Sequence, residues 1–255
     1  MQFCIFVFAQ PARRGGNCRK QPFYHFEWTV VLTQTNAMYK RICIFILLLF
    51  YNICYSQNLV LNPDFETYSQ CPNNVDGLGY AVPWFNPAVP LNISSPDYFN
   101  QCTSNPWIYV PDNWLGYQNA HSGVGYGGAI MIYYQYSNFR EYLEVPLVRA
   151  LDADSCYHFE MYMNLANVSK YATGDVGVYF SDTLIDNFAT FPLPFVPQII
   201  NNTGFITDTL NWTLISGDYT ATGGESYIII GNFKNDNNTT TVIVDSTAIW
   251  INAYY

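Results

Sequence analysis

Basic residues are scarce in most of this 255-residue chain, and their scarcity disfavours whole classes of ligand. Residues 57–255 contain four Lys and Arg against eighteen Asp and Glu, so this segment has a formal charge of −14. Nucleic acids and anionic membrane surfaces are bound by clustered Lys and Arg, and we expect neither as a partner. The acidic surface is compatible with cations or neutral glycans.

The chain also lacks the short motifs of common catalytic and metal sites. It has no Cys-x-x-Cys, no Cys/His cluster, no nucleophile elbow, no zinc-protease motif and no phosphate-binding loop. Glycoside cleavage needs two facing carboxyls, but Glu141 and Glu144 stand three apart on an expected strand and should point to opposite faces. We therefore predict a protein that is not an enzyme, with glycan cleavage as the least favoured alternative.

A single long hydrophobic run, residues 42–51, follows a short basic start at Met38. The small residue Ser56 comes soon after it, which is the layout of a secretory signal peptide. The run is broken at Asn52 and is shorter than the roughly 20 residues of a membrane-spanning helix. We predict that residues 38–56 are a cleaved signal peptide, that the protein is secreted or displayed on the cell surface, and that the mature chain does not insert into the membrane.

Residues 1–37 precede this signal, where an exported protein has no use for them. They show no hydrophobic periodicity, so we interpret them as an extension from a start codon placed too early, with Met38 as the true start. An unusually long basic region ahead of the signal is the alternative. A lipoprotein acylated at Cys54 is less favoured, because the large branched Ile53 stands where a small residue is expected.

Three cysteines follow the predicted signal. Cys71 and Cys102 lie in loops rich in Pro, Asn and Ser, and exported proteins mature where disulfides persist. A bridge between them would stabilise a long irregular region by about 3–4 kcal/mol. Cys156 lies in a strand-like run and is expected to be a buried thiol.

Short strand-like runs separated by turn sequences dominate the second half of the chain, and no helical period lasts three turns. We predict an all-β domain over residues 57–255, an antiparallel β-sandwich of jelly-roll type. Residues 67–123 are expected to form long ordered loops over the sandwich or a small subdomain. The expected strands are 129–136, 142–148, 156–165, 176–180, 212–215, 227–233, 240–245 and 248–252.

Alternation along three of these runs leaves one tyrosine on each outer face. The apolar residues of 140–147, 157–164 and 176–180 share one side of each strand, which we expect to face the core. Tyr142, Tyr162 and Tyr179 then lie outside and would form an aromatic platform.

Several segments resemble a known group of proteins. Residues 58–66, NLVLNPDFE, resemble the N-L-x-x-N-x-x-F-E opening of carbohydrate-binding modules with a galactose-binding-like jelly-roll fold. A closer similarity, over nearly all of 57–255, is to surface domains of gliding-type Gram-negative bacteria, which often precede an outer-membrane protein A-like or type IX secretion sorting segment. The matching pieces are AVPWF (81–85), PDYFN (96–100), GYQN (116–119), SGVGY (122–126), REY (140–142), GVYFS (177–181), DTLNW (208–212) and GGESYIIIGNF (223–233).

The resemblance also implies a structural Ca²⁺ ion. In such jelly rolls a Glu of the first strand and an Asp of the last often help to hold calcium, and the matching residues here are Glu66 and Asp245. The alternative is two solvated acids that never meet. The chain departs from the group's closing pattern of paired aspartates, which is only Asp245-Ser246 here.

Aromatic side chains offer flat apolar faces on which sugar rings stack. Beside the three tyrosines, Trp84, Trp107 and Trp114 of the loops are candidates, although packing against other aromatics is the competing explanation for each. We predict a non-catalytic surface module for binding or adhesion, with carbohydrate as the leading ligand. The alternative function is that of a structural component of a surface or motility apparatus, which binds protein and not carbohydrate.

Overall fold

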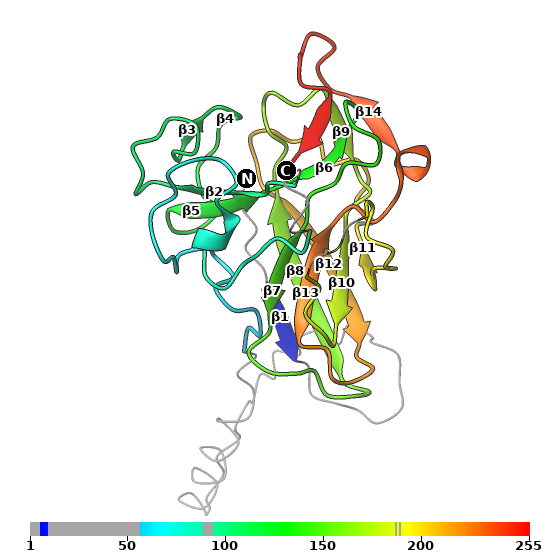
Figure 1. The fold of residues 1–255 in the computed structure, drawn as a ribbon. Helices are drawn as coiled ribbons and strands as arrows, with labels where there is room; N and C mark the ends of the chain where they lie inside the picture. The colour runs from blue at the N-terminus through cyan, green and yellow to red at the C-terminus, as the bar shows by residue number, and fades with distance from the viewer. Residues whose placement is uncertain (1–5, 10–56, 89–93, 187, 189) are drawn as a thin grey trace, which may run out of the picture.

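The computed structural model describes residues 6–9, 57–88, 94–186, 188 and 190–255 (Figure 1). This part of the chain contains no α-helix: it consists of antiparallel strand pairs, loops and two single 3-10 turns, η1 (Leu78–Tyr80) and η2 (Asp236–Asn238), so the all-β prediction is confirmed. None of its helices has the length and apolar character needed to cross a bilayer. The predicted signal, 38–56, lies outside the described residues.

Seven strands form the two larger sheets. In the first sheet the order is β11-β10-β13-β7, and in the second it is β1-β8-β12. The strands of the first are β7 (Leu143–Pro146), β10 (Gly177–Ser181), β11 (Ile199–Ile200) and β13 (Tyr227–Gly231). Those of the second are β1 (Phe6–Ala9), β8 (Cys156–Met163) and β12 (Thr213–Thr220).

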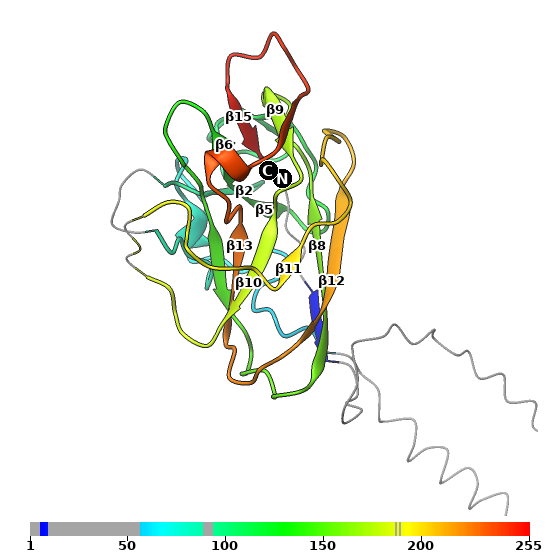
Figure 2. The same ribbon diagram turned by 90° about the vertical axis from the view of Figure 1, so that its right-hand side faces the viewer.

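Both larger sheets turn one face toward a common hydrophobic core. Along β8 the burial alternates strictly, with the odd-numbered residues from Tyr157 to Met163 buried, as the sequence predicts. Phe180 of β10 enters the same core, where its ring lies 4.6 Å from that of Tyr219 and 6.4 Å from that of Phe159. Each such ring stabilises the fold by about 1.5–3 kcal/mol through burial alone. Figure 2 shows β10 and β13 beside β8 and β12.

The outer face of the first sheet has a second, smaller hydrophobic cluster. Tyr142, which we predicted to be exposed, is fully buried there with its ring 5.3 Å from that of Phe233. Its hydroxyl donates to the Asn232 carbonyl at 2.8 Å and accepts from the Leu193 N–H at 3.0 Å. Alternation assigned Tyr142 to the correct face of the sheet. The prediction that Tyr142 is exposed was wrong, because the chain around Leu193 folds back over that face.

Four two-stranded pairs complete the structure, and three strands of two of these pairs lie within residues 67–123, which we expected to be loops. One of these two, β3 with β4, is a tight hairpin (Figure 1). The pairs are β2 (Asp97–Asn100) with β5 (Gly125–Gly128), β3 (Asp112–Asn113) with β4 (Gly116–Tyr117), β6 (Ile130–Tyr133) with β15 (Asn252–Tyr254), and β9 (Tyr171–Thr173) with β14 (Thr241–Ile243).

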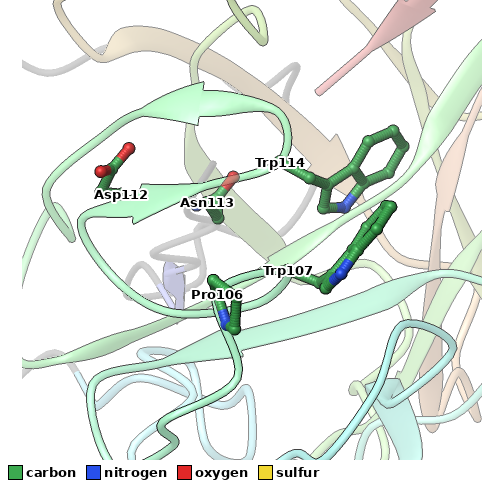
Figure 3. Close-up of a pocket in the computed structure, with 5 residues that line it drawn as sticks. All are labelled: Pro106, Trp107, Asp112, Asn113 and Trp114. Carbon is green, nitrogen blue, oxygen red and sulfur yellow. The ribbon is translucent and has the colours of Figure 1, made fainter.

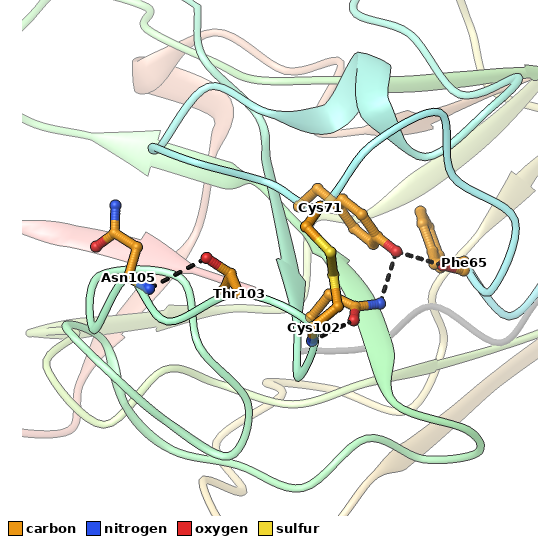
Figure 4. Close-up of a disulfide and its surroundings, with 7 residues drawn as sticks. Phe65, Cys71, Cys102, Thr103 and Asn105 are labelled. Atoms are coloured by element: carbon orange, nitrogen blue, oxygen red, sulfur yellow. Dashed lines mark hydrogen bonds between the residues drawn. A yellow bond between two sulfur atoms is a disulfide. The ribbon is translucent and has the colours of Figure 1, made fainter.

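The predicted disulfide between Cys71 and Cys102 is present, with the two Cα atoms 5.7 Å apart (Figure 4). Buried hydrogen bonds adjoin it. Tyr98 donates its hydroxyl to the Phe65 carbonyl at 2.9 Å and accepts from the Asn100 side-chain amide at 2.7 Å. The bridge and these bonds together hold a stretch of chain that has little regular secondary structure.

Two features of β8 differ from expectation. Cys156 is half-buried and disulfide-bonded, so the prediction of a buried free thiol is wrong. Strand β1 also pairs with β8, with Phe6 opposite Glu160 and Ala9 opposite Tyr157. We had not expected residues 1–37 to contribute a strand.

Candidate ligand-binding site

A cavity of about 330 Å³ opens in the irregular region beside the β3–β4 hairpin. Five residues line it: Pro106, Trp107, Asp112, Asn113 and Trp114 (Figure 3). Figure 3 shows Asp112 and Asn113 toward one end and the two indoles close together at the other. Two of the three tryptophans predicted to bind ligand therefore line the same hollow.

Local hydrogen bonds shape the hairpin that forms the polar end of the cavity. The Asn113 side chain accepts from the Leu115 N–H at 3.0 Å, an Asx turn, and donates to the Tyr126 hydroxyl at 2.9 Å. Gly116 has a φ of 125°, which residues with a side chain rarely adopt. A Cβ atom at this position would lie 2.1 Å from Oδ1 of Asn167, so both the backbone and the packing require glycine.

Three tryptophans meet at the apolar end: Trp107 and Trp114 from one loop region, and Trp250 from near the C-terminus. The ring centroids of Trp107 and Trp114 are 6.0 Å apart, and Trp250 packs edge-on against Trp114 at 5.4 Å. Trp107 is 56% exposed and Trp250 37% exposed. The indole N–H of Trp114 is buried and has no hydrogen-bond partner in the described part of the chain.

A buried polar network lies next to these tryptophans. The ring of Tyr254 is 6.3 Å from that of Trp114, and its hydroxyl donates to Asp97 at 2.6 Å. Burial raises the pKa of Asp97 to about 6. Burial, and then the charge of Asp97, raise the pKa of Glu141 to about 8. Both carboxyls are enclosed, so they support the site and do not reach a ligand.

Trp84 is not part of the site, and its prediction as a ligand-binding residue is wrong. Its side chain is 1% exposed and stacks on Phe65 with centroids 4.6 Å apart. Its indole N–H donates to the Asn62 carbonyl at 2.8 Å. It is a core residue with a satisfied polar end.

The predicted tyrosine platform does not form. Tyr142 is buried, and the half-buried Tyr179 stacks on Phe195 at 4.7 Å. Tyr162 lies on β8, in the other large sheet, and stacks on His121 at 4.0 Å. Each ring is packed against a side chain of its own surroundings, because loops cover the strand faces that alternation left outside.

The two carboxylates proposed for calcium are engaged in separate turns. Glu66 accepts from the Val124 and Gly125 N–H groups at 2.7 and 2.9 Å. Asp245 accepts from the N–H and hydroxyl of Thr247 at 2.8 and 2.6 Å. Within the described ranges no three His, Cys, Asp or Glu side chains converge on a possible metal position. These residues do not fit a shared ion, so calcium stays a prediction without geometric support.

Trp250 and Asp112 belong to the site, but we did not select them from the sequence. Trp250 lies in the last expected strand, 248–252, whose observed counterpart β15 begins only at Asn252. Because the sequence placed it inside a strand, nothing distinguished it from a residue packed on a sheet. Asp112 precedes Asn113 in a Pro-Asp-Asn-Trp turn, a composition that marks a loop but not a binding residue.

Comparisons with known proteins yield no match: no family model, no curated protein and no solved structure is similar to this chain. The similarity to bacterial surface domains therefore stays a prediction from short sequence segments.

Proposed function

We propose that the protein is a secreted, non-catalytic surface module that binds carbohydrate in the cavity beside Trp107 and Trp114. The exposed indole face of Trp107 at the rim of a polar-ended cavity is the observation that most favours this function. Sugar rings combine apolar faces with polar edges, and this site offers both complements. Asp112 supplies acceptor oxygens, and the buried Trp114 N–H beside the cavity has no partner within the described residues.

The same proposal includes the type of β-fold and the location of the protein outside the cytoplasm. We propose a jelly-roll sandwich of galactose-binding-like type, exported by the signal 38–56 and cleaved after Ser56. The shared core of the two larger sheets is compatible with such a sandwich, and the Cys71–Cys102 bridge suits an oxidising compartment. Amino-terminal sequencing of the exported protein tests this: a chain that retains Met38 would contradict it. Cleavage would also remove β1 from the edge of β8.

Glycan-array screening followed by calorimetry on the purified chain tests carbohydrate binding. We expect selective binding that weakens at least tenfold in Trp107→Ala, because stacking and buried apolar area contribute more than about 1.4 kcal/mol. Tyr136→Ala is the matched control, since Tyr136 is 57% exposed and outside the cavity lining. Trp107 is exposed enough for its variant to fold, which the thermal midpoint verifies. Equal loss in both variants, or no binding to any glycan, would refute the site.

One surface favours the protein-binding rival. The segment from β14 to Trp250 exposes Ile243, Val244 and Ile249, the last at 86%. Isolated exposed apolar residues are ordinary, but a group of them beside a tryptophan is typical of a protein contact. Protein binding would be favoured if no glycan on the array bound and if a protein partner lost its binding in the variant Ile249→Ser.

A further inference from the structure

The charge around the tryptophan cavity narrows the class of sugar that it would accept. Asp112 is the only charged residue among the five that line the cavity, and it is exposed. Within the described residues no side chain donates a hydrogen bond to its carboxylate or forms an ion pair with it. The negative charge of Asp112 is therefore not neutralised by a neighbouring side chain, and it acts on a ligand in the cavity.

The few cations of residues 57–255 are committed elsewhere. Arg140 is buried and pairs with Asp236 at 3.0 Å, Arg149 pairs with Asp152 at 2.8 Å, and Lys234 pairs with Asp175 at 2.6 Å.

The fourth cation, Lys170, helps to lower the pKa of Asp245, after the hydrogen bonds that Thr247 donates to that carboxylate. It does not line the cavity. An anionic sugar would thus meet a carboxylate and no base, on a domain that already carries a large negative charge.

The two indoles add attraction for the opposite charge. The face of an indole ring is electron-rich and attracts an ammonium group within about 6 Å of its centroid. Trp107 and Trp114 are neighbours, with centroids 6.0 Å apart and planes inclined by 42°, and Trp107 is 56% exposed, so its ring is accessible to an ammonium group in the cavity. A carboxylate and two indoles in one cavity are suited to recognising an amine.

We infer that the cavity selects amino sugars with a free amine, over their acetylated counterparts and over acidic sugars. This inference rests on the proposed function, because it names the substrate class of that same site. The ring would stack on the exposed face of Trp107, and its ammonium group would lie between the indoles and Asp112.

Binding of three matched oligosaccharides to the full chain tests the inference: a glucosamine oligomer, the same oligomer N-acetylated, and an oligogalacturonate. We expect the free-amine oligomer to bind about fivefold more tightly than the acetylated one, and the acidic oligomer to bind most weakly. Raising the salt concentration should reduce this preference.

The variant Asp112→Asn should bring the affinities of the two glucosamine oligomers within about twofold, because it should weaken binding of the free-amine oligomer more than binding of the acetylated one. Asp182→Asn, on the loop after β10, removes the same charge from an exposed position outside the cavity lining and should change nothing. An unaltered amine preference in Asp112→Asn would overturn the inference alone. Failure of all three oligomers to bind would overturn both it and the carbohydrate site.

Discussion

The two larger sheets and the irregular region of residues 57–128 both bury large aromatic residues, but they hold them by different means. In the sheets, Phe159 lies among alternating apolar neighbours on a regular ladder. In the irregular region, Phe99 on the short β2–β5 pair and Trp84 on a loop are also buried, and the surrounding chain depends on a disulfide and on side-chain bonds to the backbone.

The difference explains why the candidate site lies where it does. The sheet face that carries Tyr142 is covered, whereas the β3–β4 hairpin presents Trp114 beside a hollow. Its hydrogen bonds fix the hairpin locally, so its side chains need not be buried to be held in position. Loops on a rigid scaffold are common places for binding residues for this reason.

The largest loss of stability should come from removing a large side chain from the core between the two larger sheets. We expect Phe159→Ala to lower the free energy of unfolding by about 3–5 kcal/mol, because neighbouring strands are fixed by their ladders and cannot close the cavity. Phe99→Ala removes an equally buried ring from the short β2–β5 pair, which has fewer neighbouring strands to keep a cavity open, and should cost less. Urea unfolding of both variants measures this difference. Equal costs would mean that the irregular region is as rigid as the sheets.

The next effect should come from the bridge in the irregular region. Replacing both Cys71 and Cys102 by Ala should lower the free energy of unfolding by about 3–4 kcal/mol, since the closed loop restricts the unfolded chain. Paired substitution is preferable to a reducing agent, which would also break the disulfide bond of Cys156. A double variant as stable as the native chain would show that hydrogen bonds alone hold this region.

The regular strands could be predicted from the sequence because period-two alternation directly reflects burial on one face. The odd-numbered positions of β8 and the apolar positions of β10 are buried as expected. Exposure of the other face could not be predicted, because it depends on which distant segment folds over it. Tyr142 was expected in solvent, but it is buried, and so is Glu144 two residues further on.

The candidate site was only partly accessible to sequence reasoning. Trp107 and Trp114 could be selected as loop tryptophans, but Trp84, with the same composition around it, is core. Its burial depends on a stack with Phe65 that no local pattern encodes. Trp250 joins Trp114 from more than a hundred residues away, next to the pairing of β15 with β6. Contacts at such separation leave no periodic signal in one sequence.

Buried carboxyls just before β7 and within it bind neighbouring loops, and they make stability depend on pH. Glu141 accepts from the Ser95 N–H at 2.8 Å, and Glu144 accepts from the Ile185 N–H at 3.0 Å. Burial raises the pKa of both to about 8, above the 4.5 of an unperturbed Glu. Between these values the folded protein keeps protons that the unfolded chain has lost. The stabilisation is therefore complete below pH 4.5 and is lost as the pH rises toward 8.

The smallest of the three effects should be the contribution of one such carboxyl. We expect the native chain to be less stable at pH 8 than at pH 5, and Glu144→Gln to reduce that difference by about 1–2 kcal/mol, because the amide cannot ionise in its buried position. Denaturant titrations at both pH values measure it, with Asp182→Asn as the exposed control. A rise in native stability from pH 5 to pH 8 would contradict the sign. An unchanged difference in Glu144→Gln would mean that enough water reaches the Glu144 carboxyl for it to ionise in the folded protein at little cost.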